Sequence, residues 1–312
     1  MGNFIPAILG ILSSALTNTK KANDVFMKLI AIDMDGTLLS SDGSISDENL
    51  QAILEVKKQG HHIAICSGRY HDDILHILKP YKLHLPIISG NGSSIYDNGF
   101  LKQLFLDKQT VLEIINALRQ YEIPVELYTD QGIFMEKDTK SFLYNEIDEL
   151  AKSSPAIDKD YYRHHADIVF SQNNMIFVRD VEELDLLNLN VTKISGNTFN
   201  QEKLSLLEKQ TMARNDVSIS SGGPPSIEFT HKDANKGFGL RYLASHLQIP
   251  MENTVAIGDQ INDIPMLKAA GISIAMENAD DVVKSHAMFT TDHHDQHGVA
   301  NALRKHVLKT HE

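Results

Sequence analysis

Two aspartates, Asp33 and Asp35, follow a short apolar run in the stretch KLIAIDMDGTLL. The run Leu29–Ile32 has the length and β-branched character of a strand that is buried on both faces. Because side chains alternate along a strand, residues two apart can point into one small volume at its end. Gly36 allows a sharp exit of the chain, and Thr37 adds a hydroxyl nearby. The pattern predicts a paired-carboxylate site, although acids after a strand are also common turn formers.

Further polar residues follow other predicted strands or begin a predicted helix. They are Ser67 after strand 62–66, Lys236 at the start of a helix, and Asp259, Asn262 and Asp263 after strand 254–257. The ends of adjacent parallel strands meet at one sheet edge, so these groups can converge although they are far apart in sequence. Several carboxylates in one pocket would raise each other's pKa. A hard divalent cation removes this conflict, and Mg²⁺ prefers oxygen ligands together with a substrate phosphate.

These residue types divide into three chemical roles. A carboxylate held by a metal can attack phosphorus and form an aspartyl-phosphate. A second carboxylate two residues later can protonate the leaving oxygen and then deprotonate water. A hydroxyl, a lysine and backbone N–H groups can hold the phosphoryl oxygens, whose charge must be stabilised during transfer.

The elements that would position these residues alternate between strand and helix. Strands are predicted at 28–35, 62–66, 86–89, 227–229, 254–257, 272–275 and 288–290, with helices at 47–59, 70–79, 236–247, 263–269 and 298–308. This alternation is typical of an α/β fold with a parallel sheet. An Asp42-Gly43 turn suggests a small hairpin flap after the first strand.

The pattern changes in the middle of the chain. Helices are predicted at 109–121, 139–152, 180–188 and 200–213, with strands at 125–129, 133–137, 176–178 and 191–195. The two strands that flank Asp130-Gln131-Gly132 read as an antiparallel hairpin. We therefore expect a catalytic α/β domain made of residues 27–106 and 214–312, and an α+β module inserted at 107–213.

The polar residues resemble, in order and spacing, the four motifs of haloacid dehalogenase-like phosphatases. The motifs are Asp33-Met34-Asp35-Gly36-Thr37, Ser67, Lys236, and Gly258-Asp259-Gln260-Ile261-Asn262-Asp263. The resemblance covers essentially residues 28–308, and the inserted module looks like the cap of the Cof-type branch, class IIB. The resemblance implies a Rossmann-like core, a mobile cap and Mg²⁺-dependent hydrolysis of small phosphorylated metabolites such as sugar phosphates, nucleotides or phosphorylated cofactors.

The same resemblance implies roles for the acidic residues. Asp33 would be the nucleophile and a Mg²⁺ ligand. Asp35 would be the general acid and base, and its backbone carbonyl would also bind the metal. Asp259 would be a further Mg²⁺ ligand, and Asp263 would stand behind the ligands and orient Lys236.

Other matched positions would contact the phosphoryl group or substrate. They are Thr37, which would also brace its loop, and Ser67, Gly68, Arg69, Asn91, Lys236 and Asn262. Arg69 could contact an anionic substrate or pair with a nearby acid. Asn91 is a plain turn residue by its type, and only the resemblance places it at the pocket.

Composition limits the remaining possibilities. The 312 residues are 42% hydrophobic and 22% charged, as in a soluble globular protein, and carry a formal net charge of −12. The charge disfavours a general nucleic-acid or anionic-membrane binder, but not a small anionic substrate in a locally positive pocket. Cys66 is the single cysteine, which excludes an internal disulfide and fits a reducing cytoplasm.

The N-terminal segment consists of an apolar run and a polar stretch that precede the first predicted strand. The apolar run Phe4–Leu16 is too short to span a bilayer, and no lysine or arginine precedes it. We expect residues 1–26 to be an extension outside the fold, with a weak membrane-surface helix as the alternative. Near the other end, His293, His294 and His297 form a cluster that we interpret as a polar loop; a transition-metal site is the alternative.

Two other functions remain compatible with the motifs. A phosphomutase or phosphotransferase would pass the phosphoryl group from Asp33 to an organic hydroxyl instead of water. A non-catalytic phospho-receiver or regulatory binding module would need no acid or base two residues after the phosphoacceptor. The presence of Asp35 therefore favours an enzyme.

Overall fold

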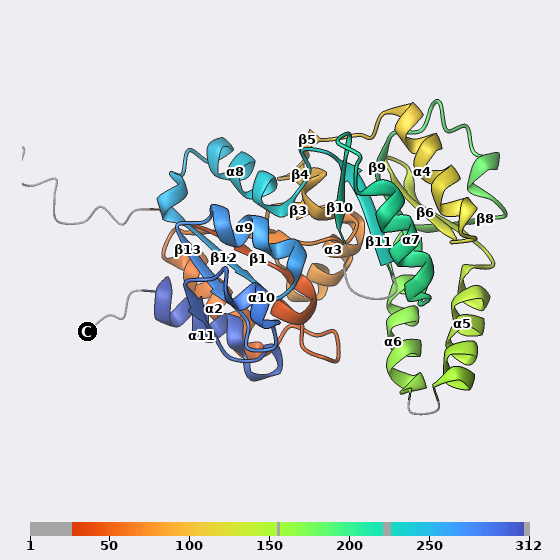
Figure 1. The fold of residues 1–312 in the computed structure, drawn as a ribbon. Helices are drawn as coiled ribbons and strands as arrows, with labels where there is room; N and C mark the ends of the chain where they lie inside the picture. The colour runs from red at the N-terminus through yellow and green to blue at the C-terminus, as the bar shows by residue number, and fades with distance from the viewer. Residues whose placement is uncertain (1–26, 155–156, 221–225, 309–312) are drawn as a thin grey trace, which may run out of the picture.

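The computed structural model describes residues 27–154, 157–220 and 226–308, so the predicted extension 1–26 lies outside the described residues. The chain forms two β-sheets, each with its own helices (Figure 1). We call the eight-stranded sheet and its helices the core module. We call the six-stranded sheet and its helices the inserted module.

The core sheet has the strand order β14-β13-β12-β1-β2-β3-β4-β5 and is parallel from β14 to β3. Its strands are β1 (Leu29–Ile32), β2 (His62–Cys66), β3 (Ile87–Ser89), β4 (Ser94–Tyr96), β5 (Phe100–Gln103), β12 (Thr254–Gly258), β13 (Ile272–Ala275) and β14 (Phe289–Thr290). β1 lies between β12 and β2, with Ile32 opposite both Ile257 and Ile65. The residues that follow these three strands therefore emerge side by side at one edge of the sheet.

Helices cover both faces of the core sheet (Figure 1). They are α2 (Asp47–Lys58), α3 (His71–Leu78) and α11 (Gly298–His306) on one face, and α8 (Lys236–His246), α9 (Ile264–Ala269) and α10 (Asp281–Lys284) on the other. The alternation within β1 explains this sandwich, because Ile30 and Ile32 pack on the first set and Leu29 and Ala31 on the second. The predicted doubly buried strand is confirmed.

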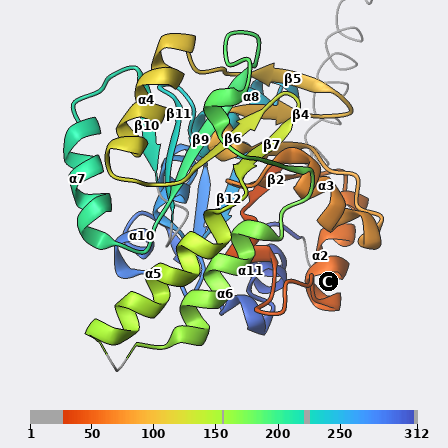
Figure 2. The ribbon, with the colours of Figure 1, turned by 90° about the vertical axis from the view of Figure 1, so that its right-hand side faces the viewer.

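The inserted module has the strand order β10-β11-β9-β6-β7-β8. Its elements are α4 (Lys108–Gln120), β6 (Val125–Thr129), β7 (Gly132–Glu136), α5 (Thr139–Ser153), α6 (Lys159–Phe170), β8 (Met175–Val178), β9 (Val191–Asn197), α7 (Gln201–Thr211), β10 (Val217–Ser220) and β11 (Ser226–His231). Helices α4 and α7 pack on one face of this sheet, and α5 and α6 form a separate antiparallel pair (Figure 2). The opposite face of β6, β9 and β11 is left for the cavity described below.

Several predictions for the inserted module need correction. Residues 214–312 were predicted to belong to the catalytic domain. This was wrong for residues 217–231, because β10 and β11 pair within the six-stranded sheet of the inserted module. A helix was predicted at 180–188, but only a turn, Val181–Glu183, forms there. The chain leaves the helical conformation at Leu184, whose φ of −76° and ψ of 149° are extended, and Val181, Leu186 and Leu189 are buried in the cluster beneath α4.

Other elements were absent from the prediction. The hairpin of β4 and β5 extends the core sheet, and α6 stands beside α5. The predicted flap around Asp42-Gly43 is a tight turn, in which Gly43 N donates to Ser40 O at 2.8 Å. Within the described ranges, no helix is long and apolar enough to cross a bilayer.

Candidate active site

Three buried carboxylates meet at the edge of the core sheet where β1 and β12 end. Asp33 follows β1, Asp259 follows β12, and Asp263 lies at the start of α9; each is 4% exposed or less. One carboxylate oxygen from each lies within 4.8 Å of the others. The backbone fixes this arrangement, because Asp33 N donates to Ile257 O at 2.9 Å.

Lys236 enters this cluster from the first turn of α8. Its Nζ donates to Asp33 Oδ1 at 2.6 Å and to Asp263 Oδ1 at 2.5 Å, and the residue is 1% exposed. Asn235 caps the same helix by accepting from Phe238 N at 2.8 Å, which places Lys236 at the first helical position. The contact between Asp263 and Lys236 is the one that the resemblance implied.

The remaining oxygens of the cluster are held by hydrogen bonds. Asp263 Oδ2 accepts from the backbone N–H groups of Asp259 and Gln260, both at 2.9 Å. Thr37 Oγ1 donates to Asp259 Oδ1 at 2.8 Å, so Thr37 braces a carboxylate instead of lining the cavity. Asn278 donates to Gly36 O at 2.9 Å and to Asp259 Oδ2 at 3.3 Å. Sequence reasoning missed Asn278, which lies outside the four motifs.

The electrostatics of the cluster favour a bound cation. Burial, and then the charge of Asp263, raise the pKa of Asp33 well above its ordinary value, although Lys236 opposes this. The same two causes raise the pKa of Asp259 to about 6. Burial alone would lower the pKa of Lys236, but Asp263 and Asp33 raise it well above its ordinary value. The all-oxygen donor set fits a hard divalent cation, which would relieve the repulsion between these carboxylates.

The second motif carboxylate, Asp35, is not part of this cluster and pairs with Arg69. Arg69 Nε and Nη2 donate to the two oxygens of Asp35 at 2.7 and 2.8 Å. The third guanidinium nitrogen, Nη1, donates to Asp73 Oδ2 at 2.6 Å. Asp35 keeps a side-chain exposure of 52%, so its carboxylate remains accessible from the cavity. Arg69 therefore pairs with acids, as one of the two interpretations expected; because it also lines the cavity, contact with a substrate stays a prediction.

A cavity of about 280 Å³ lies between the two modules in front of Asp33. The core module lines it with seven of the predicted residues: Asp33, Asp35, Ser67, Gly68, Arg69, Lys236 and Asn262. The predicted residues Thr37, Asn91, Asp259 and Asp263 lie behind this lining. Ser67 Oγ accepts from Arg69 N at 3.2 Å, which closes the turn after β2.

The inserted module lines the cavity with residues that sequence reasoning missed. Polar side chains alternate with apolar ones in three neighbouring strands, and the polar set faces the cavity: Glu126 and Tyr128 in β6, Lys193, Ser195 and Asn197 in β9, and Ser226 and Glu228 in β11. Helix α6 adds His165, Ile168 and Val169. The alternation with a period of two was a usable sequence signal for the strands. No such signal marked α6.

A buried chain of hydrogen bonds joins the two modules across this cavity. Lys193 Nζ donates to Glu228 Oε1 at 2.5 Å and to Gly68 O at 2.9 Å. Asn91 Nδ2 donates to Glu228 Oε2 at 2.6 Å and its Oδ1 accepts from Asn262 Nδ2 at 3.2 Å. Asn91 therefore supports the cavity wall from behind. Burial raises the pKa of the neighbouring Glu126 to about 7.

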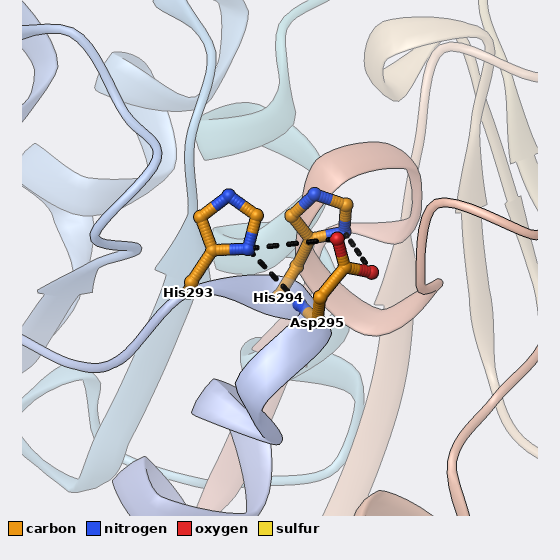
Figure 3. A group of neighbouring side chains, drawn as sticks. All are labelled: His293, His294 and Asp295. Carbon is orange, nitrogen blue, oxygen red and sulfur yellow. Dashed lines mark hydrogen bonds and ion pairs between the residues drawn. The ribbon is translucent and has the colours of Figure 1, made fainter.

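The histidine loop is attached to the chain that follows the first motif. His293 and His294 lie side by side with Asp295 (Figure 3), and this trio could hold a metal ion. Asp295, however, accepts from Ser41 N at 2.7 Å and from Ser41 Oγ at 2.6 Å, while His294 Nδ1 donates to Leu39 O at 2.8 Å. These bonds give the trio a structural role.

Gly36 makes the turn between Asp35 and Thr37 with a φ of +73°, and it leaves no room for a side chain. A Cβ at this position would lie 2.4 Å from Asp259 Oδ2. Gly36→Ala should therefore displace Asp259 and lower turnover by about 100-fold, because small misplacements of reacting groups have large effects.

Gly43→Ala is the matched control for this substitution. Gly43 has a similar φ of +79° and no atom within 4 Å of the added Cβ, so only backbone strain is added. Turnover of an aryl phosphate and the melting temperature separate the two effects. Equal losses of activity in both variants would contradict the proposed steric cause.

Comparison with known proteins identifies the family of this chain. The family model described as haloacid dehalogenase-like hydrolase matches residues 30–303. Phosphatase YwpJ of Bacillus subtilis is 33% identical, with 90% of this chain and 100% of the relative covered. The 5-amino-6-(5-phospho-D-ribitylamino)uracil phosphatase YwtE of the same organism is also 33% identical, over 88% of this chain and 96% of the relative.

Solved structures agree with these relatives. A haloacid dehalogenase-like hydrolase from B. subtilis superimposes with a TM-score of 0.80 at 33% identity, covering 90% of this chain and 100% of its own. The subclass IIB sugar phosphatase BT4131 shares the fold with a TM-score of 0.72 at 22% identity, over 89% and 98% of the two chains. The chain therefore belongs to the haloacid dehalogenase-like hydrolases, as a phosphatase of the Cof type with a subclass IIB fold.

Proposed function

We propose that this phosphatase hydrolyses small phosphorylated metabolites in a Mg²⁺-dependent reaction through an aspartyl-phosphate on Asp33. The observation that carries the proposal is the position of Asp33. It lines the cavity, contacts Lys236 at 2.6 Å and lies within 4.8 Å of two further buried carboxylates. A carboxylate in this setting can act as a nucleophile while neighbouring positive charge stabilises the phosphoryl group.

The phosphoryl group would be held by donors that already line the cavity. Lys236 Nζ supplies a positive charge, and Ser67 supplies a hydroxyl in the lining of the same cavity. Asn262 presents an amide Nδ2 that donates one hydrogen bond to Asn91 Oδ1 at 3.2 Å and has a second N–H for a phosphoryl oxygen. These groups would stabilise the charge that spreads over the equatorial oxygens during transfer.

Asp35 would perform the two proton transfers. In the first step Asp33 attacks phosphorus, the ester P–O bond breaks, and Asp35 donates a proton to the leaving alcohol oxygen. In the second step Asp35 takes a proton from water as the water oxygen attacks phosphorus, which releases inorganic phosphate and restores the Asp33 carboxylate. The accessible carboxylate of Asp35, which lines the same cavity as Asp33, suits this role.

Asp33, Asp259 and the backbone carbonyl of Asp35 would hold Mg²⁺ in this proposal, with Asp263 behind them. The bound ion would neutralise part of the charge on the carboxylates and the phosphate. The raised pKa values of Asp33 and Asp259 support this assignment, because they reflect uncompensated negative charge in a buried site.

The volume of the cavity and the net charge of the chain favour a small substrate. The cavity volume of about 280 Å³ suits a phosphorylated metabolite, and the net charge of −12 disfavours a nucleic acid. The name of the relative YwtE also specifies a small phosphate ester. We propose a cytoplasmic location, because the single cysteine suits a reducing compartment.

Release of inorganic phosphate from p-nitrophenyl phosphate with Mg²⁺ tests the proposal directly. Adding an alcohol such as glycerol as a competing acceptor distinguishes hydrolysis from phosphotransfer. Hydrolysis predicts equal amounts of p-nitrophenol and inorganic phosphate. A large excess of p-nitrophenol over phosphate would favour the phosphotransferase, and ligand binding without turnover would favour a binding module.

Removal of divalent cations should lower turnover by at least about 100-fold, because a bound cation supplies several kcal/mol of charge stabilisation. The measurement is phosphate release after EDTA treatment, followed by titration with Mg²⁺. Circular dichroism before and after treatment serves as the control for folding. Full turnover in excess EDTA would contradict the assignment of the acidic cluster as a metal site.

A further inference from the structure

The guanidinium group of Arg69 is shared between two carboxylates with different surroundings. Two of its nitrogens hold the accessible carboxylate of Asp35, and the third holds Asp73 at 2.6 Å. Asp73 lies in the first turn of α3 and is 2% exposed. A planar guanidinium that is held on both sides has little freedom to rotate. The contact with Asp73 therefore limits the orientation in which Arg69 donates to Asp35.

The second oxygen of Asp73 belongs to the contact between the two modules. Asp73 Oδ1 accepts from the backbone N–H of Asn173, which lies between α6 and β8, at 2.8 Å. Two neighbouring contacts join the same surfaces: Asn174 Nδ2 donates to Asp72 Oδ2 at 2.9 Å, and Tyr70 Oη donates to Thr129 O at 2.8 Å. The start of α3 is thus one of the places where the inserted module is hydrogen-bonded to the core module.

We propose that Asp73 is a positioning residue that couples docking of the inserted module to the placement of the Asp35 carboxylate, through Arg69. This inference rests on the proposed acid and base role of Asp35. With the modules docked, Asp73 has hydrogen bonds on both oxygens and holds the guanidinium still. Without Asn173 the buried carboxylate lacks a donor on Oδ1, and it then holds Arg69 less firmly.

Asp73→Asn tests this coupling with little change in shape. The amide oxygen can still accept from Asn173, but the amide N–H₂ group then faces another donor, Nη1 of Arg69. We expect kcat/KM for an alkyl ester such as glycerol 2-phosphate to fall about ten-fold further than kcat/KM for p-nitrophenyl phosphate. The alkyl alkoxide needs a proton from Asp35 to leave, whereas p-nitrophenolate leaves without one.

Asp72→Asn is the matched control. Asp72 is adjacent in sequence and also contacts the inserted module, but no hydrogen bond joins it to Arg69 within the described residues. We expect kcat/KM for both substrates to stay within about two-fold of the values for the unmodified protein, because partly exposed contacts contribute little. Asp73→Ser, which removes the carboxylate and leaves space for water, repeats the measurement should Asp73→Asn fail to fold.

A double-mutant cycle with Arg69→Lys shows whether Asp73 acts through Arg69. Lysine keeps the charge but cannot bridge both carboxylates as the guanidinium does. We expect Asp73→Asn to cause no additional selective loss on the alkyl ester once Arg69 is lysine. If the selective losses caused by Asp73→Asn and Arg69→Lys add in the double variant, the inference is overturned. Equal losses of kcat/KM for both esters in Asp73→Asn would overturn it as well.

Asp35→Asn separates this inference from the proposed function. A selective loss on glycerol 2-phosphate in Asp35→Asn, without one in Asp73→Asn, would show that only the positioning role is wrong. Equal losses of kcat/KM for the two esters in Asp35→Asn would instead refute the acid role of Asp35, and the inference would fail with it. Selective losses in both variants support both statements.

Discussion

Asp33→Asn is expected to abolish phosphate release, with a loss of at least about 10⁴-fold in turnover of any phosphate ester, because none of the other three motif carboxylates is placed to attack instead. Asp259 and Asp263 lie behind the cavity lining, and their oxygens are engaged by Thr37 and by backbone N–H groups. Asp35 lines the cavity but is turned toward Arg69. An amide at position 33 retains the shape of the side chain without its nucleophilic oxygen.

The fold should survive this substitution. The raised pKa of Asp33 shows that burial and the neighbouring Asp263 disfavour its charged form, so a neutral amide removes an unfavourable charge. Lys236 keeps Asp263 as a partner at 2.5 Å. We therefore expect a melting temperature close to that of the unmodified protein, and inactivity that unfolding does not explain.

Asp35→Asn is the matched control, since it changes a carboxylate of the same motif. Rapid quench with a radiolabelled aryl phosphate should trap phosphoenzyme in Asp35→Asn, because an activated ester needs no acid for the first step. Asp33→Asn should give none. Phosphoenzyme in Asp33→Asn, or turnover near that of the unmodified protein, would show that the nucleophile lies elsewhere.

Lys236→Met should lower both the free energy of unfolding and turnover. Methionine removes the cation that Asp33 and Asp263 share at 2.6 and 2.5 Å and leaves two buried carboxylates without their partner. Breaking a buried ion pair by removing one partner typically costs about 3–5 kcal/mol. The same substitution takes away the positive charge beside the nucleophile, so we expect turnover to fall by at least about 100-fold.

Chemical denaturation and aryl phosphate turnover measure these two effects separately. Lys236→Met/Asp263→Asn removes one of the unpaired charges and should recover part of the stability without recovering turnover. Lys193→Met is the comparison for a second buried lysine, which pairs with Glu228 at 2.5 Å. It should be destabilised as well, with a smaller loss of aryl phosphate turnover. Near-normal activity in Lys236→Met would exclude Lys236 from the phosphoryl site.

Local patterns in the sequence were sufficient to identify the catalytic half of the cavity. The apolar runs that become β1, β2 and β12 are buried strands, and the polar residues after them emerge at one edge because the strands are parallel and adjacent. This is why Asp33, Ser67 and Asp259 could be grouped before any contact was known. Lys236 and Asp263 joined them because helix starts stand at the same edge.

The other half of the cavity depended on information that local patterns do not carry. Helix α6 has a single fully buried residue, Ala166, and it packs against α5, so its stability depends on that tertiary contact. β11 looks like a core strand until its antiparallel pairing with β9 and β10 is known. The apolar residues near 180–189 suggested a helix, but the chain becomes extended at Leu184 after a single helical turn.

The sequence by itself determined the two aspartates of the first motif, their distant partners and the family to which they belong. Strand ends and helix starts are encoded over a few residues, and their order fixes the parallel sheet. Only the tertiary structure decided that Asp35 pairs with Arg69, and that Lys193 and Glu228 face the cavity. Each of these contacts joins side chains that are more than 30 residues apart in the sequence, so their distances follow from how the strands and the loops after them pack and not from local spacing along the chain.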